Sequence, residues 1–553
     1  AAFPGGSASS GAHGNSSRRR VLGVASVVFI VYFNVCGGPW GSEEMLSDAG
    51  PLPGIVGIFL FAALWGMPVA LVTSEMSSAF PDDGGYSLWV GEAFGGFWGF
   101  QESYYSWVSG IVDNAIYPGL VYSAIVNVIS AAQIDHTAAG VDTVTAYMAA
   151  HPLVKYLIKL GIATLFMLPN LLCIRGVGKS TIYLAAFVMA PFVVLICVCI
   201  PQLEPGRLFL PPWNAVNASS QLFSTFGANI SGSSSSSSTA PSSADGGYLA
   251  YPTSWGAGWS DLLSVLYWNM SGFDCISTCA GEVKDVGQTI YRALSIALAI
   301  IVVSYVLPLS FATMASTPQN LATWGNDDGE CSWACIARNV GGEWLMIWVF
   351  ISSIAGNAGM YVAEMFEDSW QLRGMAEQGM MPKFLAKRHP TYETPVNAVL
   401  VSYLLIAGLC CFDFMDNLSI NNFFSCGSCL LEIFAFLKLR MYNPELTRPF
   451  RVPLDSWKLV LMCAMPIFLG AFVLVSCFNQ GFGVAMTNGA AVVFGVLLYF
   501  GMRNAGYRYE YSVKRQRLLS ESEAGSDAGN GSRNGAAGVD DSSGGGSGVA
   551  YNA

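Results

Sequence analysis

Residues 34–45 read NVCGGPWGSEEM and directly follow the apolar run VLGVASVVFIVYF at residues 21–33. The apolar run is typical of the first half of a membrane-spanning helix, but two glycines, a proline and two glutamates stand where the second half should be. A backbone group left unpaired in lipid is costly, so irregular backbone at membrane depth is tolerated only inside protein or beside a cavity. We therefore expect residues 36–39 to face the interior of a membrane protein.

The composition of the chain supports a membrane protein with many spans. Of its 553 residues, 53% are hydrophobic and 11% are charged, which leaves too little polar surface for a soluble globule. A hydrocarbon core about 30 Å thick needs roughly 20 apolar residues per helix, and the chain contains about twelve such segments. The predicted spans are residues 20–48, 51–79, 94–129, 152–171, 180–201, 257–281, 289–316, 341–366, 395–413, 417–440, 455–478 and 483–503.

Most lysines and arginines fall in alternate loops between these spans, beginning with the run of arginines at residues 18–20. Basic residues are enriched on the cytoplasmic side of membrane proteins. We therefore expect a multi-pass protein with both termini in the cytoplasm and a twelve-helix membrane domain over residues 20–503. Residues 1–19 and the Gly-, Ser- and Asp-rich tail at 504–553 are predicted to be disordered.

The segment 202–256 is predicted to be a flexible, Ser-rich outer loop. It contains two glycosylation sequons, at Asn217 and Asn229, which fall on the predicted outer side. Cys331 and Cys335 lie in another predicted outer loop, where they either form a disulfide or remain free thiols. The outer loop at 130–151 contains no cysteine that could link the chain to a glycoprotein partner. We therefore expect no disulfide-linked heavy chain, as such a partner is called.

A second interrupted span lies five spans after the first. Residues 266–283 read LYWNMSGFDCISTCAGEV, an apolar helix interrupted by small and polar residues. Transporters built from two inverted five-helix repeats place corresponding broken helices at the substrate site. The spacing therefore predicts an all-α membrane protein with a 5+5 inverted repeat, discontinuous helices 1 and 6, and spans 11 and 12 outside the repeat. Two unrelated packing kinks are the alternative.

A set of motifs in a characteristic order carries a family resemblance over residues 21–500. These motifs are GGPWGSEE (37–44), TSEM (73–76), FPDDGGYSLWV (80–90), WVSGIVDNAIYP (107–118), YWNMSGFDCISTCAGEV (267–283), EDSWQLRGMAEQGMMP (367–382) and RPFRVP (448–453). The chain resembles the amino acid, polyamine and organocation (APC) superfamily, and within it the polyamine uptake transporters of plants and trypanosomatids. The resemblance implies a LeuT-type fold, placement in the plasma membrane and proton-coupled uptake of putrescine or spermidine.

A polyamine is a flexible alkyl chain that carries ammonium groups and no carboxylate. Its site should offer separated acids for the charges and aromatic walls for the methylenes, with each cation–π contact worth about 0.5 to 2 kcal/mol. Asp274 lies at the break of the sixth span, where an ionised carboxylate is costly unless it is paired or hydrated. A carboxylate that binds either a proton or an ammonium can couple the movement of the substrate to the movement of protons. A structural hydrogen-bonded cap is the alternative for Asp274.

Asp113 lies near the middle of the third span, and an acid within the membrane is by default a functional hypothesis. Alternatively, its neighbour Asn114 could form a hydrogen bond with Asp113. Asp113 would then have a structural role in a polar contact between helices. Glu43 and Glu44 follow the first break, where we expect at least one of them to attract dications from an outer vestibule. The family resemblance places a substrate-contacting aromatic at Trp268.

The remaining candidates have weaker support. Trp107 and Tyr117 flank polar elements of the third span. Glu75 and Glu364 are predicted near the cytoplasmic ends of spans 2 and 8, where each belongs either to an inner gate or to the interface. Glu432 in span 10 has no assigned role. The predicted substrate-binding residues are Asp274, Trp268, Gly37, Gly38, Glu43, Trp107, Asp113, Asn114, Tyr117 and Tyr361, and the predicted proton-coupling residues are Asp274 and Glu75.

An amino acid permease for cationic or large neutral substrates, on the same fold, is the main alternative to a polyamine importer. We do not expect an enzyme, because the four histidines are scattered and no HExxH, GxSxG or P-loop motif is present. The expected partners are an organic cation, protons and the lipid bilayer. No metal, cofactor or nucleic acid is expected, because the proton gradient supplies the driving force.

Overall fold

The structure is a computed structural model that describes residues 20–43, 45–46, 50–134, 147–148, 150–172, 174–210, 258–321, 324, 333–412, 414–479 and 482–509. These residues form helices and no strand, apart from one isolated bridge between Leu22 and Val283. The helices are α1 (Val24–Val35), α3 (Pro51–Phe61), η1 (Ala62–Gly66), α4 (Met67–Ala79), α5 (Gly85–Phe94), α6 (Gly96–Ile134), α8 (Pro152–Leu172), α9 (Ile174–Cys199), η2 (Ile200–Gln202), η3 (Pro205–Phe209), α11 (Gly258–Asn269), η4 (Cys275–Glu282), α12 (Val286–Ala315), α13 (Pro318–Leu321), α14 (Trp333–Gly341), α15 (Glu343–Glu377), α16 (Val396–Leu409), α17 (Phe414–Tyr442), α18 (Ser456–Asn479) and α19 (Phe482–Asn504).

Eight helices of the described residues are long and apolar enough to cross a membrane. They are residues 51–79, 152–172, 178–202, 286–315, 343–377, 416–442, 456–478 and 482–504. Two shorter apolar helices, α1 and α16, match the first and ninth predicted spans. The third and sixth predicted spans correspond to α6 and to α11 with η4, which carry many polar residues. The all-helical membrane architecture is therefore confirmed, while the twelve-span inverted repeat stays a prediction.

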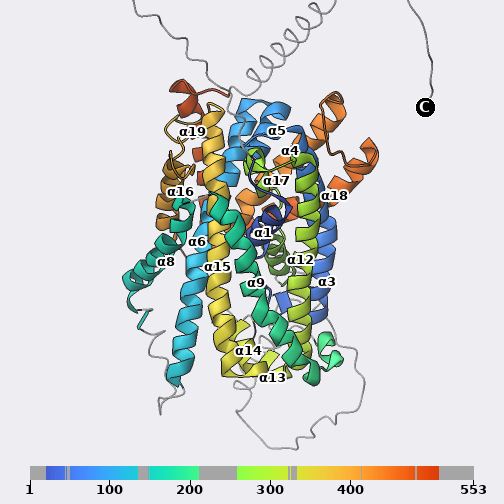
Figure 1. Cartoon of the computed structure of the whole chain (residues 1–553), viewed down its shortest axis with the longest axis vertical. Coiled ribbons are helices and arrows are strands. Elements are labelled where there is room, and N and C mark those ends of the chain that lie inside the picture. The colour runs from blue at the N-terminus through green and yellow to red at the C-terminus, as the bar shows by residue number, and fades with distance from the viewer. Residues whose placement is uncertain are drawn as a thin grey trace, which may run out of the picture.

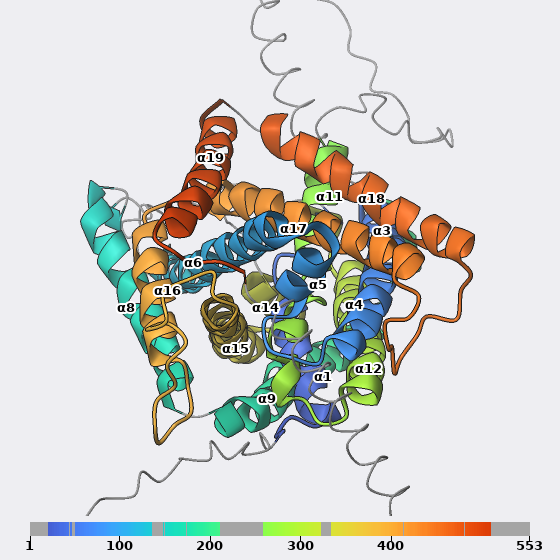
Figure 2. The same cartoon turned by 90° about the horizontal axis from the view of Figure 1, so that it is seen from above.

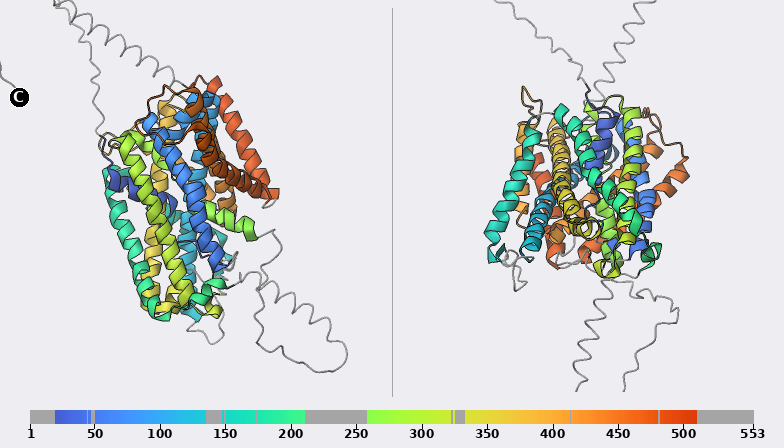
Figure 3. Two further views of the ribbon diagram at one scale, coloured as in Figure 1. Left: turned by 90° about the vertical axis from the view of Figure 1, so that its right-hand side faces the viewer. Right: turned by 60° about the horizontal axis from the view of Figure 1, so that its bottom comes forward.

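The long helices run side by side along the long axis of the molecule, as α6, α9, α12 and α15 show (Figure 1). Seen from above, α8, α18 and α19 lie at the periphery (Figure 2). α1 is surrounded by α9, α12 and α15, against which it packs. α3 and α4 form one long element that packs along α12 (Figure 3, left). The polar segments of the chain therefore lie inside a bundle whose outer helices are apolar.

Two helices that the hydropathy pattern does not predict lie at opposite ends of the bundle, α5 at one end and α14 at the other (Figure 1). α5 packs against η4 so closely that a Cβ at Gly85 would lie 2.1 Å from the Ser277 hydroxyl. At the other end, the Trp333 indole of α14 donates a hydrogen bond to the Pro39 backbone oxygen at 2.6 Å. Each short helix therefore contacts one of the interrupted spans.

Some predictions concern residues that the structure does not describe. Cys335 forms a disulfide, but Cys331 lies outside the described residues, so the pairing of these two cysteines stays a prediction. Glu44 and the sequons at Asn217 and Asn229 also lie outside the described residues, as do residues 1–19 and 510–553.

Candidate functional site

The two interrupted spans meet at their breaks. α1 ends at Val35 and α11 ends at Asn269, and the chain after each is irregular, with positive φ at Gly37 and Gly272. A glycine is required at 272 because a Cβ there would lie 2.9 Å from the backbone oxygen of Asn34. The predicted breaks in both spans are therefore present, and they pack directly against each other.

A cavity of about 50 Å³ lies beside these breaks. Five carboxylates line it, while no lysine, arginine or histidine among the described residues does so. The carboxylates belong to Asp113 of α6, Asp274 immediately before η4, and Glu364, Glu367 and Asp368 of α15. The aromatic residues of the wall are Trp40, Tyr86, Tyr117, Trp268 and Tyr305. The arrangement therefore provides negative charge and aromatic surface in one enclosed space.

Three donors hold the Asp113 carboxylate in place. The Tyr117 hydroxyl donates to Oδ2 at 2.7 Å, and the Trp268 indole and the Asn421 amide donate to Oδ1 at 2.9 and 3.1 Å. The predicted structural contact with Asn114 is absent among these bonds, because the Asn114 amide donates to Asp368 Oδ2 instead. Asp113 thus joins α6, α11 and α17 and still faces the cavity.

The acids of α15 form the largest group in the cavity wall. Glu364, Glu367 and Asp368 are spaced three and four residues apart, which places them on one helix face. The Asn34 amide of α1 donates to Glu367 Oε1 at 2.5 Å, and Glu367 Oε2 is buried with no hydrogen-bond partner among the described residues. A buried acceptor without a donor is costly, so this oxygen is well placed to accept a hydrogen bond from a ligand ammonium.

The sequence prediction missed Glu367 and Asp368 and placed Glu364 near a cytoplasmic end. The predicted span ended at residue 366, whereas α15 continues to Glu377. The acids therefore lie well inside the helix. The spacing of three acids on one face was the signal in the sequence that could have identified them.

Asp274, at the break of span 6, lies in the cavity wall. Glu432 of α17 is a buried acid close to Asp274. Trp268 also lies in the wall and connects to Asp113 through its indole. The structure therefore brings together Asp274, Trp268, Asp113 and Tyr117 of the predicted set.

Other predicted substrate-binding residues lie outside the cavity wall. The Trp107 indole donates to the Ser402 hydroxyl of α16 at 3.1 Å, and Tyr361 is buried against Phe166 with their ring centroids 5.8 Å apart. Asn114 is not part of the cavity wall, and its amide donates a hydrogen bond to Asp368 Oδ2. Gly37, Gly38 and Glu43 belong to the first break, but Cys36 and Trp40 are the residues of that segment that reach the cavity.

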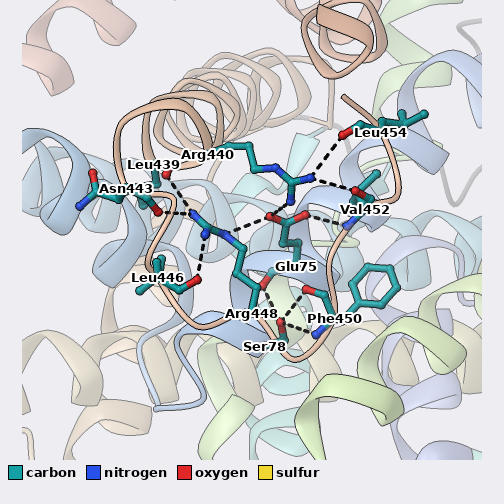
Figure 4. A network of polar contacts seen from close by, with 10 residues as sticks. All are labelled: Glu75, Ser78, Leu439, Arg440, Asn443, Leu446, Arg448, Phe450, Val452 and Leu454. Carbon is teal, nitrogen blue, oxygen red and sulfur yellow. Dashed lines mark hydrogen bonds and ion pairs between the residues drawn. The ribbon is translucent and has the colours of Figure 1, made fainter. Parts of the chain in front are cut away.

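Glu75 lies outside the cavity wall, in a network of ion pairs (Figure 4). Its Oε1 atom is 2.5 Å from Arg440 Nη1 and 3.1 Å from Arg448 Nε, and the backbone N–H of Val452 donates to Oε2 at 2.8 Å. The Ser78 hydroxyl donates to the backbone oxygen of Phe450 at 3.1 Å in the same network. Glu75 therefore ties α4 to the end of α17 and the segment after it. The role of Glu75 in proton coupling stays a prediction.

A second ion-pair network lies near α5. Arg373 of α15 is 3.2 Å from Asp83, and Arg388 is 2.9 Å from Glu282 at the end of η4. Both guanidinium groups lie over the ring of Trp370, 4.7 and 4.5 Å from its centroid. These contacts hold η4 against α15 and the segment before α5.

Comparisons with known proteins find similar sequences over most of the chain. The family model described as "Amino acid permease" matches residues 22–500. The chain is 33% identical over 487 residues to "Polyamine transporter PUT1" of Oryza sativa subsp. japonica, which covers 88% of this chain and 79% of the relative. It is 33% identical over 476 residues to "Polyamine transporter RMV1" of Arabidopsis thaliana, which covers 86% of this chain and 84% of the relative.

Proposed function

This chain belongs to the amino acid permease family, and we propose that it imports polyamines such as putrescine and spermidine by proton symport. The proposal includes a LeuT-type arrangement of twelve spans, placement in the plasma membrane and both termini in the cytoplasm. The match to the family model and the polyamine transporters among the similar proteins support it.

The charge of the cavity is the observation that carries the substrate assignment. Five carboxylates face it and no basic residue of the described chain does so. In addition, α1 and α11 end at the cavity, at Val35 and Asn269, and the C-terminus of a helix carries partial negative charge. These charges favour a ligand with several ammonium groups and oppose a ligand with a free carboxylate.

The aromatic residues of the wall suit the rest of the ligand. The rings of Trp268 and Tyr117 flank Asp113, to which both donate hydrogen bonds. An ammonium paired with Asp113 would therefore have aromatic surface beside it for cation–π contact and for its methylene groups. We propose that Asp113 and Asp274 bind the two ends of a diamine, with the acids of α15 between them.

Transport then proceeds by alternating access around this site. The broken helices tilt to open the cavity to one side and then to the other. A membrane potential that is negative inside favours entry by about 2.3 kcal/mol per charge for each 100 mV, and a dication gains twice that amount. Proton coupling at Asp274 adds to this driving force.

Uptake into proteoliposomes tests the proposal. Purified protein is reconstituted, and uptake of radiolabelled putrescine, spermidine, arginine and leucine is measured with and without an inward proton gradient. We expect accumulation of at least one polyamine, stimulated by the gradient. Accumulation of arginine or leucine with both polyamines ignored would show that the amino acid permease alternative is correct.

A close contact between α6 and α15 provides a second test. A Cβ at Gly110 would lie 1.8 Å from Asp368 Oδ1, so alanine at this position must displace a carboxylate of the cavity wall. We expect Gly110→Ala to raise the KM for putrescine roughly tenfold, which corresponds to about 1.4 kcal/mol of lost binding.

Gly119→Ala is the matched control on the same helix, because the nearest atoms to a Cβ there are 3.9 Å away, on Lys159. It should keep the wild-type KM. An unchanged KM in folded Gly110→Ala protein would contradict a role for Asp368 in substrate binding.

A further inference from the structure

Two buried carboxylates lie behind Asp274, where α6 packs along α17. Glu102 of α6 is 0% exposed and Glu432 of α17 is 1% exposed. The hydroxyl of Ser428, one turn before Glu432, lines the cavity and lies 2.9 Å from Glu102 Oε1 and 3.5 Å from Glu432 Oε1. A hydroxyl has one proton to donate, so Ser428 can donate to either glutamate but not to both at once.

Ser428 connects this pair to the cavity, because Ser428 lines the cavity wall, as Asp274 does. An ionised carboxylate has no proton to donate, so Ser428 can bond to both glutamates at once only when one of them carries a proton. A path of hydrogen bonds therefore runs from Glu102 through Ser428 to Glu432, and Ser428 places it at the cavity.

This pair differs from the buried acids of the ion-pair networks. Glu75 and Asp83 each contact an arginine, whereas no basic residue of the described chain forms an ion pair with Glu102 or Glu432. Glu102 Oε2 is buried and has no hydrogen-bond partner within the described residues. A buried carboxylate without compensation is costly, and a proton on such an oxygen removes the charge.

The other titratable groups around this path bring no positive charge. They are Tyr86 of α5, Tyr267 of α11, Cys275 of η4, Cys429 of α17, and Glu364 and Glu367 of α15. We propose that Glu102 and Glu432, joined by Ser428, form the proton-binding site that couples uptake of an organic cation to the proton gradient. The inference rests on the proposed function, since it assumes proton symport.

The geometry gives each group a role. When a substrate ammonium pairs with Asp274, a proton is held on Glu432. The Ser428 hydroxyl then donates to the ionised form of Glu102, or Glu102 takes the proton and Ser428 accepts from it. The ammonium then compensates the charge of Asp274, and the proton removes the charge of one glutamate. No two adjacent carboxylates remain charged without compensation. Because Glu102 and Glu432 do not line the cavity themselves, they are positioning and proton-binding residues rather than substrate ligands.

Two assays on full-length reconstituted protein test the site. The first is exchange of external labelled putrescine for internal unlabelled putrescine without a gradient, which requires no net proton movement. The second is uptake driven by an inward proton gradient. We expect Glu102→Gln and Glu432→Gln to retain exchange and to lose stimulation by the gradient. Glu343→Gln, at an exposed glutamate of α15, is the matched control and should keep both.

The outcomes separate the two proposals. Wild-type stimulation in both glutamine variants, or loss of exchange together with driven uptake in folded protein, would overturn the proton site. If wild-type protein ignores polyamines, the substrate proposal fails, and the same assays with the amino acid that is transported still test the proton site.

If the glutamine variants do not fold, Glu102→Asp and Glu432→Asp keep a titratable group. These variants should shift the pH dependence of driven uptake but leave exchange intact, and an unshifted pH dependence would overturn the site.

Discussion

Replacing Asp274 by asparagine is expected to abolish gradient-driven uptake of polyamines. The substitution keeps the size of the side chain but removes its charge and its ability to bind a proton. Asp274 lies in the cavity wall, so the variant loses an ammonium ligand and a carboxyl group that can bind a proton. Initial rates in proteoliposomes, normalised to the amount of folded protein, measure the effect.

Two variants serve as controls for this result. Asp274→Glu restores the carboxyl group and should recover part of the driven uptake. Asp416→Asn changes an exposed acid at the start of α17 and should transport as wild type. Accumulation at the wild-type level in Asp274→Asn would remove this residue from the mechanism.

Replacing Glu75 by alanine is expected to destabilise the folded protein by about 3–5 kcal/mol, the usual cost of removing one partner of a buried ion pair. The side chains of Arg440 and Arg448 are 5% and 4% exposed. Without Glu75, both guanidinium groups would remain buried without their carboxylate. Thermal unfolding in detergent, followed by intrinsic fluorescence, measures the loss as a lower Tm.

Asp455→Ala is the matched control, because it removes an ion pair with Lys458 in which the two side chains are 75% and 47% exposed. Exposed pairs contribute little, so its Tm should stay near that of wild type.

Glu75→Gln separates stability from the predicted role in proton coupling. A stable Gln variant that no longer responds to the gradient would support coupling at Glu75. A wild-type Tm in Glu75→Ala would contradict the structural role of the network.

The positions of the spans followed from local composition. The predicted span at 51–79 coincides with α3, η1 and α4, and most others lie within a few residues of the observed helices. Hydropathy works here because lipid forces each span to satisfy its own backbone hydrogen bonds. The hydropathy pattern did not predict the part of a helix that is polar and buried among other helices, nor a short polar helix at the end of the bundle. α15 extends to Glu377 because Arg373 pairs with Asp83 inside the bundle, and α5 packs on η4.

The candidate site was predictable only in part, for the same reason. A break in a span and an acid beside it are local signals, and they led to Asp274. Whether an aromatic residue faces a cavity depends on which helix lies opposite. Trp107 points to Ser402 of α16, and Tyr361 packs on Phe166 of α8. No pattern within α6 or α15 indicates these neighbours.

The sequence by itself determined that this chain is a membrane protein with two interrupted helices, because glycine, proline and acids cannot continue an apolar helix in lipid. The tertiary structure decided which acids share a space. Asp113, Asp274 and the three acids of α15 come from three separate segments and meet only because Gly272 allows the breaks to touch and Gly110 allows Asp368 to approach α6. Charges so far apart in sequence acquire a common ligand only through packing, which local composition does not encode.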